Sequence, residues 1–117
     1  MLKGLFFILV GLSITSCYYD NAEELYMVEP CDVSAVTYSQ DVSVIISNNC
    51  LSCHSGPAAE AGLDLSSYGN VSANAALIKD RINLPAGSAG VMPQTGPMSR
   101  CNILKVTTWI NQGALDN

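Results

Sequence analysis

The sequence has 117 residues, which is enough for one domain. It carries ten Asp and Glu against five Lys and Arg, for a formal net charge of −5. No basic stripe runs along it, which argues against a nucleic-acid-binding surface. The protein is therefore small and acidic, with five cysteines and a single histidine.

The first segment, residues 1–16, has the composition of an export signal: a short positive start, then the apolar run LFFILVGL, then small residues. This run is too short to cross a bilayer, which requires roughly 20 apolar residues. A cysteine directly after small residues resembles the lipobox of bacterial lipoproteins. We therefore expect a lipoprotein signal peptide over residues 1–16 and lipidation of Cys17. The alternative is an ordinary secretory signal followed by an incidental cysteine.

A lipidated Cys17 predicts a protein of the cell envelope, anchored to a membrane and facing the periplasm or the cell surface. Acyl chains of this kind tether a protein without spanning the bilayer. Residues 18–30, YYDNAEELYMVEP, have no sustained hydrophobic period and contain four acidic residues. We expect residues 17–35 to form the lipidated N-terminus and a flexible tether, and residues 36–117 to form the folded domain.

The first helix of that domain is expected from about Ser39 to Cys50. Ser39 can cap its N-terminus, and Asp41 suits its first turn. Apolar residues recur on one face at helical spacing. That face comprises Val42, Ile45, Ile46 and Cys50.

The middle of the domain is less regular. Residues 63–68 are ambiguous, and a short helix is expected over 72–82 with Leu77, Ile78 and Ile82 directed inward. Residues 83–98, NLPAGSAGVMPQTGPM, hold three prolines and three glycines, a density that excludes a regular element.

A last helix is expected over residues 100–112, with Ser99 as its N-cap and Gly113 as its stop. Its buried face comprises Ile103, Val106, Trp109 and Ile110. Since no strand pattern is present, the fold class is all-α: three or more short helices joined by long loops. Elements this short bury little apolar surface by themselves, so we expect something further to fill the centre.

The stretch CLSCH, residues 50–54, carries the clearest chemical signal. Cysteines three residues apart lie about one helical turn apart and can form thioethers to the two vinyl groups of one haem, and the adjoining His54 can ligate the iron. Cys31 and Cys101 are then left over, and in an oxidising compartment they can form a disulfide.

Two other uses of the cysteines compete with haem attachment. A zinc site with four cysteine ligands has the right number of thiols in Cys31, Cys50, Cys53 and Cys101, but such sites usually contain two close pairs, and only one is present. A redox dithiol at Cys50 and Cys53 is usually found in a βαβ setting, which this sequence does not offer. Neither rival accounts for His54.

An iron held by His54 has a second axial position, and the chain offers no other histidine for it. The remaining methionines are Met27, in the tether, and Met92 and Met98, in the 83–98 loop. Met92 is the favoured distal ligand because glycines let its backbone approach a ligand closely and Pro93 stiffens the chain. Met98 is the second choice, because its place beside the last helix favours a packing contact.

With these motifs in place, the sequence resembles a small mono-haem c-type cytochrome, and more narrowly the bacterial lipoprotein cytochromes c. The similarity covers about residues 36–114 and rests on CLSCH followed by SG, on GLDLSSY, on the MP-containing loop and on the closing TTWINQGA. It implies a cytochrome c-like all-α fold around one covalent haem c. It also implies haem attachment at Cys50 and Cys53, with His54 as the proximal iron ligand and Met92 as the distal one.

The function implied is one-electron transfer by a membrane-tethered carrier that is not itself an enzyme, with redox proteins as partners. A haem-based peroxidase or gas-sensing domain with an open distal site is the first alternative. A zinc-stabilised interaction domain is the second.

Overall fold

A computed structural model describes residues 30–117 of the chain. The expected signal peptide, Cys17 and the tether up to residue 29 lie outside the described residues. One compact unit runs from Cys31 to Asn117, so residues 31–35, which the sequence places in the tether, belong to the folded domain. They are held there because Cys31 is cross-linked and Val33 packs against the core.

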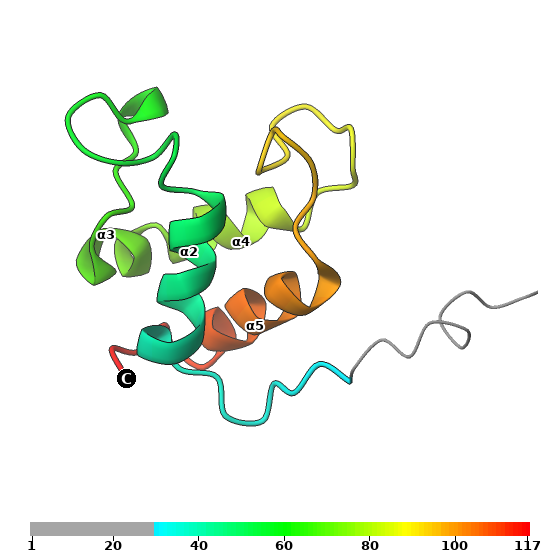
Figure 1. Ribbon diagram of the computed structural model, residues 1–117. Helices are drawn as coiled ribbons and strands as arrows, with labels where there is room; N and C mark the ends of the chain where they lie inside the picture. Colours follow the sequence, from blue (N-terminus) through cyan, green and yellow to red (C-terminus); the bar gives the residue numbers. More distant parts are fainter. Residues whose placement is uncertain (1–29) are drawn as a thin grey trace, which may run out of the picture. The chain divides into compact units, whose positions relative to one another are not determined.

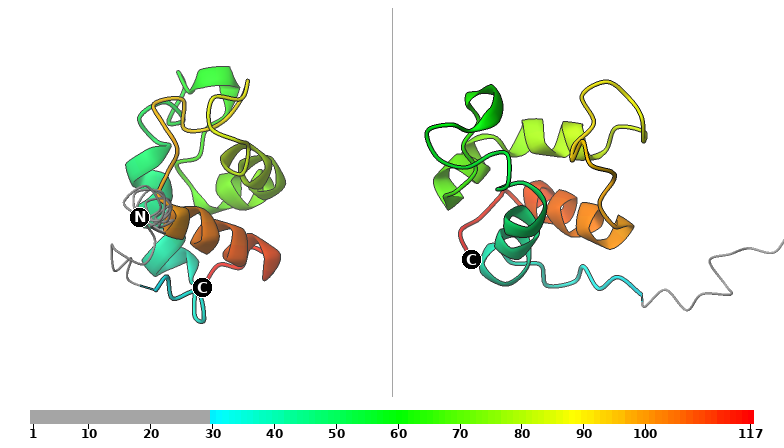
Figure 2. Two further views of the ribbon diagram at one scale, coloured as in Figure 1. Left: turned by 90° about the vertical axis from the view of Figure 1, so that its right-hand side faces the viewer. Right: turned by 45° about the horizontal axis from the view of Figure 1, so that its top comes forward.

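Residues 30–117 are helical and contain no strand, in agreement with the predicted all-α class. Four α-helices form the domain, and α5 packs against α4 and against the first helical turn, η1 (Figures 1 and 2). Their bounds are η1 Tyr38–Val42, α2 Ser43–Asn49, η2 Glu60–Gly62, α3 Tyr68–Ala73, α4 Ala75–Ile82 and α5 Arg100–Asn111.

The first helix begins one residue earlier than predicted, and its cap is Thr37 rather than Ser39. The Thr37 hydroxyl accepts a hydrogen bond from the N–H of Gln40 (3.2 Å), and the Asp41 carboxylate accepts one from the N–H of Thr37 (3.1 Å). These two bonds satisfy N–H groups that have no partner within the helix. The first turn is a π-helical turn, and α2 continues from it without a break to Asn49.

The single helix expected over residues 72–82 is two helices. Ser67 caps α3 by accepting a hydrogen bond from the N–H of Asn70 (3.3 Å), and Asn74 interrupts the helix before α4 begins. The Asn74 side chain donates to the carbonyl of Asn70 (2.8 Å), a local bond that competes with helix continuation. Of the side chains expected inward, Ile78 and Ile82 are buried, but Leu77 is 42% exposed.

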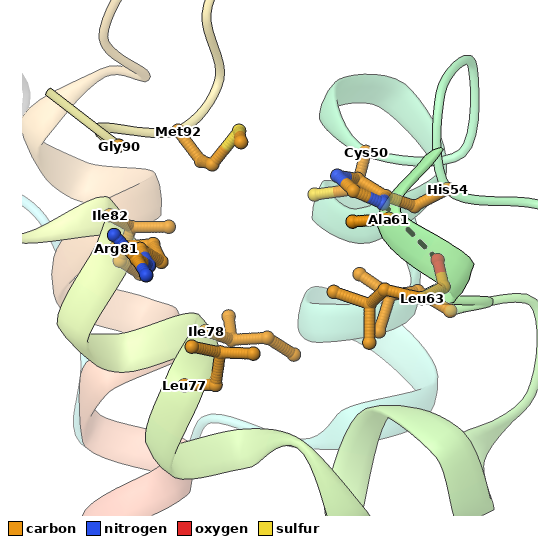
Figure 3. A pocket seen from close by; sticks show the side chains of 11 residues that line it. Cys50, His54, Ala61, Leu63, Leu77, Ile78, Arg81, Ile82, Gly90 and Met92 are labelled. Atoms are coloured by element: carbon orange, nitrogen blue, oxygen red, sulfur yellow. Dashed lines mark hydrogen bonds between the residues drawn. The ribbon is translucent and has the colours of Figure 1, made fainter. Parts of the chain in front are cut away.

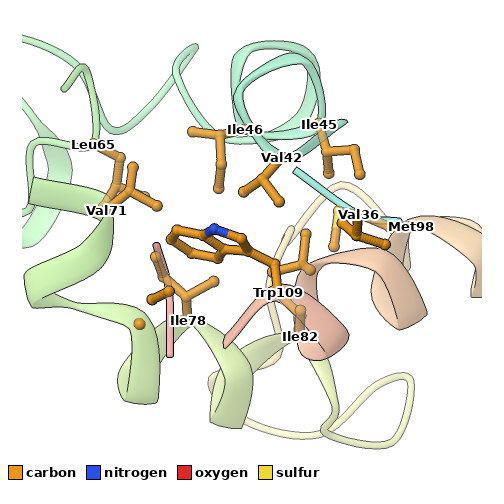
Figure 4. Packing of buried hydrophobic residues seen from close by; sticks show 13 residues of the cluster. Val36, Val42, Ile45, Ile46, Leu65, Val71, Ile78, Ile82, Met98 and Trp109 are labelled. Atoms are coloured by element: carbon orange, nitrogen blue, oxygen red, sulfur yellow. The ribbon is translucent and has the colours of Figure 1, made fainter. Parts of the chain in front are cut away.

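Trp109 is the centre of the core. Its side chain is 1% exposed and lies among aliphatic residues of α2 and of the α3–α4 pair (Figure 4). Its indole N–H donates to the carbonyl of Leu115 (2.8 Å), which folds the C-terminal segment back over α5. The buried hydrophobic set is Val36, Val42, Ile45, Ile46, Leu65, Val71, Ala75, Ile78, Ile82, Met98, Val106, Trp109 and Ala114.

The first and last residues of the domain are each held by a contact with another part of the chain. Cys31 and Cys101 form a disulfide that links the start of the domain to the first turn of α5 across a sequence separation of 70 residues. At the other end, the carbonyl of Asn117 accepts the N–H of Ser39 (2.9 Å). The ring of Tyr38, beside Ser39, packs 5.5 Å from the Trp109 ring.

Replacing Cys31 and Cys101 by serine should lower the free energy of unfolding by about 2–5 kcal/mol, because the cross-link restricts a long loop of the unfolded chain. Urea unfolding of the wild type and the double variant measures the difference. A reductant should lower the free energy of unfolding of the wild type to about that of the double variant. It should leave the free energy of unfolding of the double variant unchanged. A difference below about 1 kcal/mol would contradict the prediction.

The ion pair between Asp41 and Lys105 should make stability depend on pH. The two atoms Nζ and Oδ1 are 2.7 Å apart. The hydrogen bond from Lys105, with that from the Thr37 N–H, holds the pKa of Asp41 below its usual value. The pair therefore contributes fully above about pH 4, the usual pKa of an unfolded Asp, and its contribution is lost as the pH falls through the folded-state pKa.

Asp41→Asn should accordingly destabilise the protein by up to about 1 kcal/mol at neutral pH, since the pair is partly exposed, and by less in acid. Urea unfolding at neutral pH and in acid measures the loss of stability. Lys105→Gln, which removes the other partner of the ion pair, is the matched variant. An equal effect of Asp41→Asn at both pH values would show that the charge of Asp41 plays no part.

Candidate functional site

An apolar cavity of about 280 Å³ separates the CLSCH turn from the 83–98 loop (Figure 3). A second hollow of about 140 Å³ shares Cys50, His54, Ile82 and Met92 with it, and the two hollows together are called the slot below. The first hollow is lined by Cys50, His54, Ala61, Leu63, Leu65, Leu77, Ile78, Arg81, Ile82, Gly90 and Met92.

The CLSCH residues take their positions from the end of α2. The Cys50 N–H still bonds to the carbonyl of Ile46 (2.8 Å), as in a helix. The Cys50 carbonyl then accepts the N–H groups of both Cys53 (3.2 Å) and His54 (2.9 Å), which closes a tight turn. This turn brings both thiols and the imidazole to the same slot, as the sequence predicts for a shared ligand.

The two thiols differ in environment. Cys50 is partly buried and lines both hollows, and burial raises the pKa of its thiol. Cys53 is exposed and lines only the second hollow. They are the only free cysteines among residues 30–117, because Cys31 and Cys101 are bonded to each other.

The imidazole of His54 is oriented by a hydrogen bond at one ring nitrogen. Its Nδ1 lies 3.1 Å from the Leu63 carbonyl oxygen. A carbonyl can only accept a hydrogen bond, so Nδ1 carries a proton, and in the neutral ring Nε2 then has the free lone pair. The N–H of Leu65 donates to the His54 carbonyl (2.8 Å), which is a second bond between the CLSCH turn and the segment that contains Leu63. A ring fixed in this way is prepared to ligate a metal through Nε2.

Met92 enters the slot from the wall opposite His54, and the two side chains point toward each other across the cavity (Figure 3). Its N–H donates to the carbonyl of Arg81 (3.2 Å), which attaches the 83–98 loop to the end of α4. Gly90 has a φ of +82°, a conformation that side chains other than glycine rarely adopt, and it turns the loop toward the cavity.

The structure places the two candidate methionines differently. Met98 is 9% exposed and belongs to the hydrophobic core beside Val36 (Figure 4), so it does not line the slot. Met27 lies outside the described residues. The structure thus brings Cys50, Cys53, His54 and Met92 together and leaves Met98 in the packing role that its position predicts.

Several lining residues are not predicted as site residues by the sequence. Leu63 and Leu65 come from a loop whose structure is ambiguous from sequence. Leu77 and Arg81 lie one turn apart on α4, and this i, i+4 spacing is the signal that places them on one face. Leu77 lines this slot, although its periodicity predicts a place in the core.

Comparison with known proteins identifies no relative. No protein-family model matches the chain, and no curated protein and no solved structure matches it. Within residues 30–117, His, Cys, Asp and Glu side chains nowhere gather in threes as a metal site. No helix of that same part is long and apolar enough to cross a membrane.

The two thiols should differ in reactivity in chain expressed without haem attachment. Iodoacetamide at about pH 8 should alkylate Cys53 several-fold faster than Cys50, because the thiolate is the reactive form and burial disfavours it at Cys50. Peptide mass spectrometry at successive times measures both rates. Equal rates would contradict the burial of Cys50 seen here.

Proposed function

We propose that the slot holds one haem c and that the protein is a one-electron carrier with a cytochrome c-like fold. The observation that supports this most directly is that His54 and Met92 line both hollows of the slot, the second of which is also lined by the two free thiols, Cys50 and Cys53. When bound, the haem supplies an iron centre that cycles between the ferric and ferrous states.

The residues present fit such a group. The walls of the first hollow are mainly aliphatic, as a large planar apolar cofactor requires. The donor set is one imidazole nitrogen and one thioether sulfur on opposite walls, the combination of axial ligands that raises the reduction potential of a haem iron. With both positions taken by side chains, electron transfer is favoured over binding of small molecules.

Each residue then has a distinct role. The thiols of Cys50 and Cys53 would hold the cofactor covalently, each as a thioether to one vinyl group. His54 is held by the Leu63 carbonyl, so its Nε2 would be available as an iron ligand without a further loss of freedom. Met92 is held by the hydrogen bond from its N–H to the Arg81 carbonyl, and its thioether sulfur would be the second iron ligand.

The rival functions place different demands on the same residues. A zinc site with four cysteine ligands needs four thiolates, whereas the disulfide between Cys31 and Cys101 leaves two. A peroxidase or gas sensor needs an open distal position, whereas Met92 is directed into the slot. We therefore propose a carrier rather than an enzyme, anchored through a lipid on Cys17 in the cell envelope, with redox proteins as partners.

Met92→Ala and Met98→Ala form a matched pair of variants that test the closed distal site. Carbon monoxide should bind rapidly to the reduced Met92→Ala protein and slowly or not at all to the reduced wild type. Met98→Ala should behave as the wild type toward carbon monoxide and lose about 2–5 kcal/mol of stability, because it removes a buried side chain from the core. Stopped-flow absorbance and urea unfolding measure the two effects.

Carbon monoxide binding to the wild type as fast as to Met92→Ala would overturn the closed site and favour a sensor or peroxidase. Rapid binding to Met98→Ala alone would assign the distal position to Met98.

A further inference from the structure

Two alanines within residues 30–117 have a left-handed backbone conformation, in which glycine is the usual residue. Ala61 has a φ of +55° and Ala114 a φ of +51°. The Cβ atom of an L-residue crowds the backbone in this conformation, so a methyl group is retained there at a cost that other contacts offset. The two alanines differ in where those contacts come from.

Ala114 is stabilised by contacts within the chain. It is 7% exposed and belongs to the hydrophobic core. Its N–H donates to the carbonyl of Trp109 (3.0 Å), and its own carbonyl accepts a hydrogen bond from the hydroxyl of Tyr68 (2.9 Å). Burial of the methyl group in the core therefore offsets the cost of the backbone conformation at Ala114.

Ala61 lies in a different environment. It is exposed and belongs neither to the core nor to the partly buried residues that pack against the core. It lines the first hollow of the slot instead, and Figure 3 shows it on the same wall as His54 and Leu63, across the cavity from Met92. A ligand in the slot is therefore the partner that the methyl group of Ala61 can contact.

The backbone around Ala61 does not by itself call for a methyl group. The Glu60 N–H donates to the Cys53 carbonyl (2.9 Å), and the Leu63 N–H donates to the Glu60 carbonyl (3.1 Å). The Leu63 carbonyl then lies 3.1 Å from His54 Nδ1. A glycine in place of Ala61 would make the same turn without the steric cost. What alanine adds is a methyl group on the wall of the slot that carries His54.

We propose that Ala61 is a positioning residue whose methyl group packs against the face of the haem that His54 ligates. This inference rests on the proposed function. Burial of one methyl group changes an equilibrium constant about fourfold, which offsets the cost of the left-handed conformation. The same contact keeps water from the haem on the His54 side. A less polar surrounding disfavours the ferric state, which carries one positive charge more than the ferrous state, so the contact raises the reduction potential.

Ala61→Gly and Ala114→Gly, both in the haem-loaded protein, form a matched pair of variants that test this. Ala61→Gly should lower the folding equilibrium constant by up to about fourfold, because a packed methyl group is lost, and it should lower the reduction potential. Ala114→Gly should also destabilise the protein, because it removes a methyl group from the core, but it should leave the potential unchanged. Urea unfolding and redox titration measure the two quantities.

Glycine is favoured at a left-handed position where the methyl group has no contact. An Ala61→Gly protein as stable as the wild type, or more stable, would therefore overturn the assignment. So would a reduction potential of Ala61→Gly equal to that of the wild type.

A second measurement uses the wild type alone and does not depend on folding of a variant. In the reduced protein, a nuclear Overhauser effect should connect the methyl protons of Ala61 with protons of the haem. Ala114, which lines neither hollow, should show none. Absence of the Ala61 effect, with both sets of protons assigned, overturns the contact while leaving the carrier function intact. A wild type that retains no covalent haem overturns the proposed function and the contact together.

Discussion

The turn that ends α2 is the constraint on which the site depends. One carbonyl, that of Cys50, accepts hydrogen bonds from the N–H groups of Cys53 and His54. This turn places the two cysteines and the histidine beside the same slot. The further bond from His54 Nδ1 to the Leu63 carbonyl fixes the rotation of the ring. The helix before the turn is itself held by its packing above Trp109, so the core and the site share one support (Figure 4).

The wall of the slot opposite the CLSCH turn is formed by the irregular 83–98 loop. Contacts with other parts of the domain hold this loop in place. The Met92 N–H is held by the last residues of α4, and Met98 anchors the far end of the loop in the core. The disulfide at Cys101 secures the helix that follows. A loop rich in proline and glycine can therefore present one thioether to the cavity without a regular element of its own.

The helix cap of α5 and the all-α class can be predicted from the sequence because they depend on local sequence patterns. The Ser99 cap of α5 is confirmed, with its hydroxyl accepting the Asn102 N–H (3.2 Å), and so is the absence of strands in residues 30–117. The interruption at Asn74 is not predicted because apolar periodicity continues through it. The Cys31–Cys101 disulfide is expected from the cysteine count and is present in the structure, but the domain start at Cys31 is not predicted because residues 31–35 carry no helical or strand pattern that separates them from the tether. Arg81 is not predicted because only the placement of α4 against the loop shows that it borders the slot.

The central claim is that the thiols of Cys50 and Cys53 carry a haem covalently, and one measurement tests it most directly. Mature protein, produced with haem-attachment machinery, is denatured and extracted with acidified organic solvent, and its reduced visible spectrum and intact mass are recorded. The account predicts a haem c spectrum that survives this treatment and a mass increase of one haem. A chain that loses all haem on extraction would contradict it.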